Sequence, residues 1–324
     1  MIDDVTMRFS LDPRVLFSLL LPLAVAACGD SGTGGSGGTG GSGGGDGGSG
    51  ATGGIGGQTS STTAAGGGGS GGAPMECEGP GYEGNEPVVA LGVVQAVILD
   101  QNGDPTPANA VQLCGIDVCD YANTSASGAV TFNANKDMVK PAFKLGDGLI
   151  FAKLAILVPA GDSTYTDITT AKLPPVGEGD TFAAGASVKS GGMTIDVPAG
   201  GSVVVDELLY PEPGDQVFRA AEIPTSENTP LDPAMGFEML FGVAPMETIF
   251  CPAATLHVPN TPGWAAGAAV EFFIQGVEIG QHWAPYGEWQ KVSDGKVSED
   301  GSEVVTAEGQ GIPVLSSVAV RLAK

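Results

Sequence analysis

The chain has 324 residues and a formal net charge of -24 at pH 7. So acidic a protein is repelled by phosphate backbones and by anionic lipid headgroups, which excludes nucleic acid as a partner and docking through a basic patch. With two histidines and no CxxC pair among its five cysteines, the sequence also predicts no metal site and no cofactor.

The chain begins with an export signal that ends at a cysteine. Residues 15–27 form an uncharged apolar run, which is shorter than the ~20 residues of a membrane-spanning helix. The run closes with Val-Ala-Ala-Cys, and the cysteine is Cys28. This ending resembles a bacterial lipobox, and the resemblance implies that residues 1–28 are a lipoprotein signal with Cys28 as the lipidation site. The alternative is an ordinary secretory signal that is cleaved near Ala27.

Acylation of Cys28 would fix the protein to a lipid membrane without spanning it. Each buried methylene contributes about 0.8 kcal/mol, and more than one acyl chain gives stable anchoring. The resemblance therefore implies a place in the bacterial cell envelope. Gly29 next to the cysteine favours the outer membrane by the sorting rule of better-known lipoproteins, and the side that the protein faces, periplasm or cell surface, stays open.

Residues 29–74 have the composition of a flexible linker. About half of them are glycine, and most of the others are Ser, Thr or Ala. Such a segment cannot bury enough apolar surface to offset its ordering entropy, so we expect it to be disordered. At ~5–6 Å times the square root of its length, its mean reach is roughly 35–40 Å. The linker is thus predicted to hold the remaining residues away from the membrane.

Residues 75–175 carry the short, alternating apolar runs of β-strands, separated by Asn-Gly and Ser-Gly turns. No stretch of ten or more residues has the periodicity of an amphipathic helix. The longest continuous apolar run, residues 149–158, predicts a central strand. The other predicted strands are residues 88–99, 110–114, 129–133 and 164–170.

Four segments of this half carry a family resemblance. They are Gly-Val-Val-Gln-Ala-Val-Ile-Leu-Asp at 92–100, Asn-Gly-Asp-Pro at 102–105, Ala-Val-Gln-Leu at 110–113 and Ser-Gly-Ala-Val-Thr-Phe at 127–132. Together they resemble a carboxypeptidase regulatory-like domain. That family is a small transthyretin-like β-sandwich. The resemblance, which covers residues 88–174, implies a structural or adhesive module without catalysis.

Residues 176–324 are again a series of short apolar runs between Gly or Pro turns, which predicts a second β-sandwich. Gly-Gly-Met-Thr-Ile-Asp-Val-Pro-Ala-Gly at 191–200 and Ala-Ala-Thr-Leu-His-Val-Pro at 253–259 resemble a ZU5-like domain, although Gly-Ser replaces the Ala-Leu that usually follows Pro-Ala-Gly. The resemblance implies a β-rich interaction or scaffolding module. The predicted fold class is therefore all-β, with two β-sandwich domains after the signal and the linker.

Four cysteines remain besides Cys28, and an even number in an exported protein favours two disulfides. Cys114 and Cys119 flank four residues, and a bridge there would be worth roughly 2 kcal/mol in the chain-entropy model. By elimination Cys77 would pair with Cys251, which closes a long loop worth roughly 5 kcal/mol. Free thiols in a metal or redox role are the alternative, but the CxxC spacing of a redox pair is missing.

An aromatic segment near the C-terminus is the candidate ligand site. Its members are His282, Trp283, Tyr286 and Trp289. Flat aromatic faces stack on the apolar faces of sugars, so the segment predicts a platform for a glycan. The same rings could instead plug one end of a sandwich. The Asp and Asn residues beside glycines in the predicted turns are typical of β-hairpins. A weak calcium site at one of these turns is the alternative.

No catalytic constellation is visible. A triad needs a histidine beside a nucleophile, and His257 alternates with Leu256 and Val258 as a surface residue of a strand does. The sequence therefore predicts a non-enzymatic, membrane-anchored binding, adhesion or scaffolding module, with an envelope protein or a polysaccharide as partner. The alternatives are a carbohydrate-binding or carbohydrate-processing protein and a structural spacer without a ligand.

Overall fold

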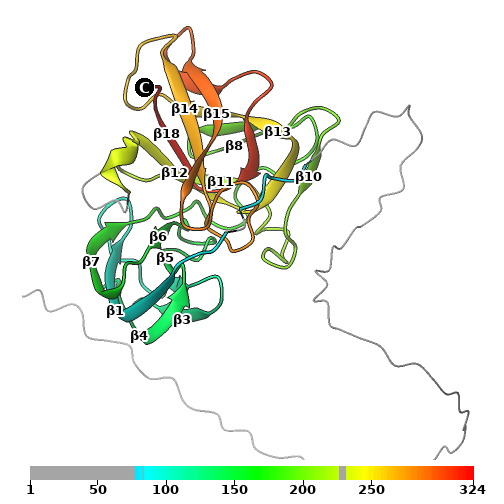
Figure 1. The fold of residues 1–324 in the computed structure, drawn as a ribbon. Helices are drawn as coiled ribbons and strands as arrows, with labels where there is room; N and C mark the ends of the chain where they lie inside the picture. Colours follow the sequence, from blue (N-terminus) through cyan, green and yellow to red (C-terminus); the bar gives the residue numbers. More distant parts are fainter. Residues whose placement is uncertain (1–76, 83, 226–230) are drawn as a thin grey trace, which may run out of the picture. The chain divides into compact units, whose positions relative to one another are not determined.

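The computed structural model describes residues 77–324 except residues 83 and 226–230 (Figure 1). The predicted signal, the lipidation site Cys28 and the whole predicted linker of residues 29–74 lie outside the described residues. The described part is built from strands, and its one helical element is the short 3-10 turn η1 (Pro233–Met235), so the all-β prediction is confirmed. No helix in this part is long and apolar enough to cross a membrane.

The first seven strands form a β-sandwich. One sheet has the order β4-β1-β7, and the other has the order β3-β2-β5-β6. The bounds are β1 (Val88–Leu99), β2 (Ala110–Cys114), β3 (Cys119–Asn123), β4 (Ala129–Val139), β5 (Ala142–Lys144), β6 (Ala155–Leu157) and β7 (Gly161–Thr169).

The alternation of buried and more exposed residues along β1 explains why the two sheets stack. After a bulge near Leu91, every second residue from Val94 to Ile98 is buried, which is the period-two pattern of a strand with one face in a core. Phe132 of β4 and Phe143 of β5 meet edge to face, with ring centroids 5.9 Å apart, and join the two sheets.

The other eleven strands form one sheet that nearly closes into a barrel. Its order is β11-β12-β18-β14-β15-β16-β13-β9-β8, and β10 and β17 also pair with β13. Ala220 N–H of β11 donates a 3.0 Å hydrogen bond to Ser190 Oγ of β8, which brings the two ends of the sheet together. The bounds are β8 (Ser187–Ser190), β9 (Met193–Asp196), β10 (Ser202–Val204), β11 (Arg219–Glu222), β12 (Met239–Ala244), β13 (Thr248–Pro259), β14 (Ala269–Gln275), β15 (Trp289–Val297), β16 (Glu303–Thr306), β17 (Ile312–Leu315) and β18 (Val318–Leu322).

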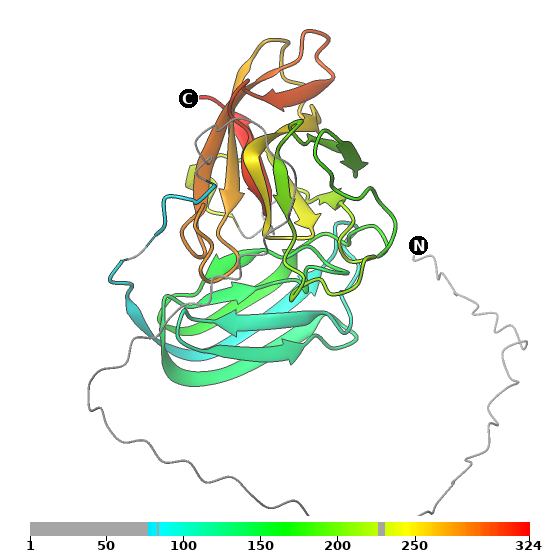
Figure 2. The same cartoon turned by 90° about the vertical axis from the view of Figure 1, so that its right-hand side faces the viewer.

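The barrel has a core of its own and also contributes residues to the core of the sandwich. All six residues of β12 are buried: Phe241 and Val243 face the barrel interior, whereas Leu240 and Ala244 belong to the sandwich core. Because neighbouring residues of a strand point to opposite faces, a strand buried on both sides is apolar throughout. Figure 2 shows β1–β7, in cyan and green, packed against the yellow to red strands of the barrel.

The boundary predicted near residue 175 is bridged by a buried arginine. Arg219 is fully buried, and its Nη1 donates hydrogen bonds to the carbonyl oxygens of Leu149 and Pro174. All described residues belong to one compact unit. The division into domains at 75–175 and 176–324 therefore stays a prediction.

Residues 149–158 are not a central strand, contrary to the sequence prediction. Only Ala155–Leu157 form a strand, β6, which lies at the edge of its sheet, and Phe151 adds an isolated bridge to Lys172. The run is apolar because it is buried between the two halves, and polar groups of the barrel satisfy its backbone. Gln275 bonds both the N–H and the carbonyl of Ala155, and Ser317 Oγ donates to Lys153 O at 2.7 Å.

Candidate functional site

A segment that we call the strap, residues 77–82, lies along the loop of residues 278–286. The predicted disulfide between Cys77 and Cys251 is present and fixes the start of the strap to β13. Gly81 N–H then donates to His282 O at 3.1 Å, and Tyr82 Oη donates to Trp283 O at 3.5 Å. The strap is thus held on the barrel by one covalent bond and two hydrogen bonds.

The second predicted disulfide is also present. Cys114 and Cys119 face each other across β2 and β3, with Cα atoms 4.0 Å apart. Tyr286 Oη donates a 3.0 Å hydrogen bond to Cys114 O, so the loop of residues 278–286 is fastened to the sandwich beside this bridge.

Three of the four predicted platform residues gather at the strap. His282 is exposed there, Trp283 is half-buried against the barrel core, and Tyr286 is buried. Trp289 lies elsewhere: its ring meets Phe237 at 64°, with centroids 5.1 Å apart. The four side chains therefore do not form one continuous platform.

Three adjoining hollows surround the strap. The strap groove, about 790 Å³, is lined by Pro80, Tyr82, Ile116, His282 and Tyr286 among others. The Glu247 pocket, about 300 Å³, is lined by Glu78, Glu247, Ile249, Gln281, His282, Trp283 and Val314. The Trp283 groove, about 390 Å³, is lined by Tyr82, Trp283, Gln290, Lys291 and Gln310.

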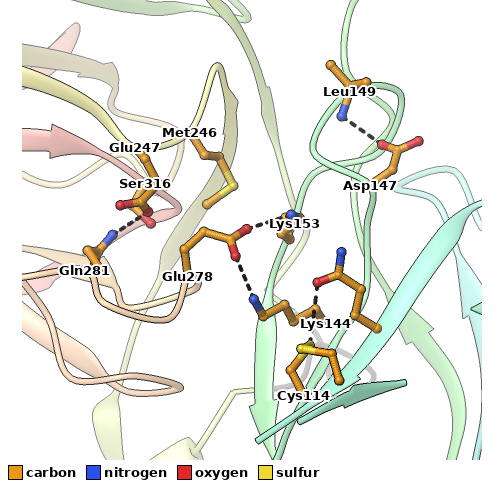
Figure 3. Close-up of polar contacts among 12 residues, drawn as sticks. Cys114, Lys144, Asp147, Leu149, Lys153, Met246, Glu247, Glu278, Gln281 and Ser316 are labelled. Atoms are coloured by element: carbon orange, nitrogen blue, oxygen red, sulfur yellow. Dashed lines mark hydrogen bonds and ion pairs between the residues drawn. A yellow bond between two sulfur atoms is a disulfide. The ribbon is translucent and has the colours of Figure 1, made fainter. Parts of the chain in front are cut away.

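A buried ion cluster ties the start of the loop of residues 278–286 to the sandwich (Figure 3). Glu278 accepts a 2.7 Å hydrogen bond from Lys144 Nζ and a 2.6 Å hydrogen bond from Lys153 Nζ. Burial lowers the pKa of Lys144. Burial opposes ionisation of Glu278 as well, but the charges of Lys153 and Lys144 outweigh it and lower the pKa of that carboxyl.

Glu247 lies beside this cluster, in the turn between β12 and β13. Its Oε1 accepts a 2.7 Å hydrogen bond from Gln281 Nε2. Burial raises the pKa of Glu247 to about 7, and the Gln281 hydrogen bond only partly offsets that effect. Gln281 Oε1 is buried and has no hydrogen-bond partner in the described part of the chain.

His257 lies outside the three hollows. Its Nε2 is 3.1 Å from Asp196 Oδ2, and its Nδ1 is 3.1 Å from Glu303 Oε1, so both ring nitrogens contact carboxylates of neighbouring strands. Asp100 accepts hydrogen bonds from the backbone N–H groups of Asn102 and Asp104 and thereby shapes its hairpin turn. No group of three or more candidate metal ligands occurs within residues 77–324 as far as they are described.

Sequence reasoning missed several residues of this region. Tyr82 and Gln281 belong to segments without a regular pattern, so no spacing pointed to them. Lys153 did leave a signal, because a single charge inside the apolar run of residues 149–158 requires a buried partner. That partner, Glu278, follows 125 residues later.

Comparison with known proteins gives little further guidance. No protein-family profile and no curated protein matches the chain. Among solved structures, a similar chain is a Bacteroides uniformis protein described as a "putative carbohydrate binding protein". It shares 10% sequence identity, the match covers 72% of this chain and 100% of that chain, and the TM-score is 0.21. Similarity at this level carries no information about the ligand of the present chain.

Proposed function

We propose that this chain is an exported, lipid-anchored, non-enzymatic binding module of the bacterial envelope. Val-Ala-Ala-Cys at the end of a short apolar run supports the anchor at Cys28, and the glycine-rich residues 29–74 support a long linker. The domain-family resemblances to a carboxypeptidase regulatory-like and a ZU5-like module are part of the same proposal.

The observation that carries the binding role is the strap region. Three adjoining hollows share residues of the strap and of the loop of residues 278–286. Aromatic and polar side chains converge there on a base that the Cys77–Cys251 disulfide fixes to the barrel. Concave surfaces with a few convergent polar groups are the usual ligand sites of proteins.

Intact mass of the membrane-extracted protein tests the anchor. We expect a mature N-terminus at Cys28 that carries acyl mass, and Cys28→Ala should leave the protein unacylated and released from the membrane. An unacylated wild-type N-terminus would contradict the anchor, while the binding role would remain to be tested separately.

Carbohydrate binding in the Trp283 groove is the second candidate. Tyr82 and Trp283 offer two aromatic side chains there, and Gln290 and Gln310 bring amides that can donate and accept hydrogen bonds. Aromatic faces for sugar rings and amides for hydroxyl groups are the two components that glycan recognition needs. The groove is open, as an extended polysaccharide requires.

A glycan array followed by titration with the strongest binding glycan tests this candidate. Trp283→Ala should weaken binding at least tenfold, because the main stacking face is lost. Trp289→Ala is the matched control, since Trp289 packs against Phe237 outside the groove. Equal losses in both variants, or no binding by the wild type, would contradict the candidate.

A further inference from the structure

The Glu247 pocket has an unusual lining. Its charged side chains are the carboxylates of Glu78 and Glu247, and it also contains the amide of Gln281 and the indole of Trp283. No lysine or arginine is among the described residues that line it. The two nearby lysines, Lys144 and Lys153, both point to Glu278 instead (Figure 3).

The pocket has more hydrogen-bond acceptors than donors. The Gln281 amide N–H₂ already donates to Glu247, whereas Gln281 Oε1 is buried without a partner in the described structure. A buried acceptor without a partner is unfavourable, and Gln281 Oε1 is shielded from solvent, so a ligand that brings an N–H donor would satisfy it once the Gln281 side chain turns toward the pocket. The remaining lining residues add apolar surface and the π-face of Trp283.

We infer that the Glu247 pocket binds the primary ammonium group of a small organic ligand. Glu247 acts as the counter-ion, and the Trp283 ring attracts the cation through its quadrupole. Gln281 Oε1 accepts an N–H hydrogen bond after a turn of its side chain toward the pocket. A cavity of about 300 Å³ lies at the lower end of ligand pockets, which fits a short-chain amine. This inference does not depend on the lipid anchor or on glycan binding.

Charge balance makes the binding depend on pH. When Glu247 is ionised, its charge and that of Glu278 cancel those of Lys144 and Lys153, and Glu78 adds a further negative charge. When Glu247 is protonated, the four-residue cluster carries a net charge of +1, which offsets the charge of Glu78 and removes the net attraction for a cation. The other titratable groups near Glu247 are Tyr210, whose pKa burial raises, and His282 at the rim of the pocket.

The test is an NMR titration of the folded protein with n-butylammonium. Its uncharged analogue n-butanol and the N–H-free cation tetramethylammonium are titrated in parallel. We expect n-butylammonium to bind most tightly, with shifts at the Gln281 side-chain amide and the Trp283 indole. Because Glu247 ionises at about pH 7, the affinity should fall about tenfold from about pH 8 to about pH 6.

Three variants localise the effect. Glu247→Gln keeps the shape of the side chain and should weaken binding at least tenfold and remove its pH dependence. Trp283→Leu keeps apolar bulk and should weaken binding several-fold. Glu299→Gln removes a negative charge from an exposed turn that lines none of the three hollows, and it should bind as the wild type does.

Two results would overturn the inference. One is that n-butylammonium fails to bind or binds no better than n-butanol. The other is that Glu247→Gln, with an unchanged melting temperature, binds the amine as tightly as the wild type. Tighter binding of tetramethylammonium would overturn the acceptor role of Gln281. Because none of the three probes is a sugar, failure of this test does not bear on glycan binding at the Trp283 groove.

Discussion

Lys144 Nζ donates a 2.7 Å hydrogen bond to Glu278 Oε2 across 134 residues of sequence. Lys144 ends β5 of the sandwich, and Glu278 follows β14 of the barrel. Lys153 Nζ donates a 2.6 Å hydrogen bond to Oε1, the other oxygen of the same carboxylate. The two halves are thus joined by a buried ion cluster in addition to the apolar core that they share.

Glu278→Gln should be strongly destabilising. The variant leaves two buried ammonium groups without a counter-charge, and breaking a buried ion pair in this way costs about 3–5 kcal/mol. Urea unfolding measures the effect as a lower midpoint at constant slope. The control is Lys291→Met, which breaks an exposed ion pair with Glu271 and Asp294 and should cost less than about 1 kcal/mol. Similar small changes in both variants would show that the cluster does not join the halves.

Gly242 provides an independent test of the shared core. It lies in β12, and a Cβ added there would overlap the Cβ of Ala152 in the sandwich half. Gly242→Ala should therefore destabilise the protein by about 1–3 kcal/mol through overpacking. The matched control is Gly214→Ala, because a Cβ at that position meets only ordinary van der Waals contacts. If Gly242→Ala unfolds at the same urea concentration as the wild type, the halves do not pack in this way in solution.

The strands could be predicted from the sequence, because the apolar alternation and the turn residues that mark a strand lie within a few residues of each other. Val88–Leu99 was predicted with the bounds that it has, since alternation and a following Asn-Gly turn both mark it. The sequence did not indicate that both faces of β12 are buried. Leu240 and Phe241 are equally apolar, and nothing in their spacing says that they belong to different cores.

The candidate site was only partly predictable, because it is assembled from distant segments. His282 and Trp283 were recognised by composition, but Tyr82 joins them only through the strap, 200 residues earlier in the chain. Trp289 was grouped with them by proximity in sequence, yet it starts β15 and packs against Phe237. Residues 149–158 were misread for a similar reason: a buried crossing segment and a central strand are equally apolar.

The pKa of Glu247 predicts how stability depends on pH. Burial raises this pKa from 4.5 to about 7, so the native state holds a proton that the unfolded state has already released. Between about pH 4.5 and pH 7 the contribution of Glu247 should therefore decrease as pH rises, by up to roughly 3 kcal/mol in total. The measurement is the difference in unfolding free energy between wild type and Glu247→Gln across that range. A difference that stays constant with pH would contradict the raised pKa.

The disulfide between Cys77 and Cys251 allows stability and site geometry to be tested together. It closes a loop with a sequence separation of 174, so the paired variant Cys77→Ser with Cys251→Ser should lose roughly 5 kcal/mol in the chain-entropy model. The matched control, Cys114→Ser with Cys119→Ser, opens a loop with a separation of 5 and should lose roughly 2 kcal/mol.

Only the first pair of substitutions releases the strap. The Gly81 amide, which bonds His282 O, should then lose its protection from hydrogen exchange, and the Trp283 groove should lose the side chain of Tyr82. Glycan affinity should fall in this variant and persist in the control, because the second disulfide lies in the sandwich. If Gly81 stays protected without the Cys77–Cys251 bond, the two hydrogen bonds alone hold the strap, and the disulfide acts only on the unfolded state.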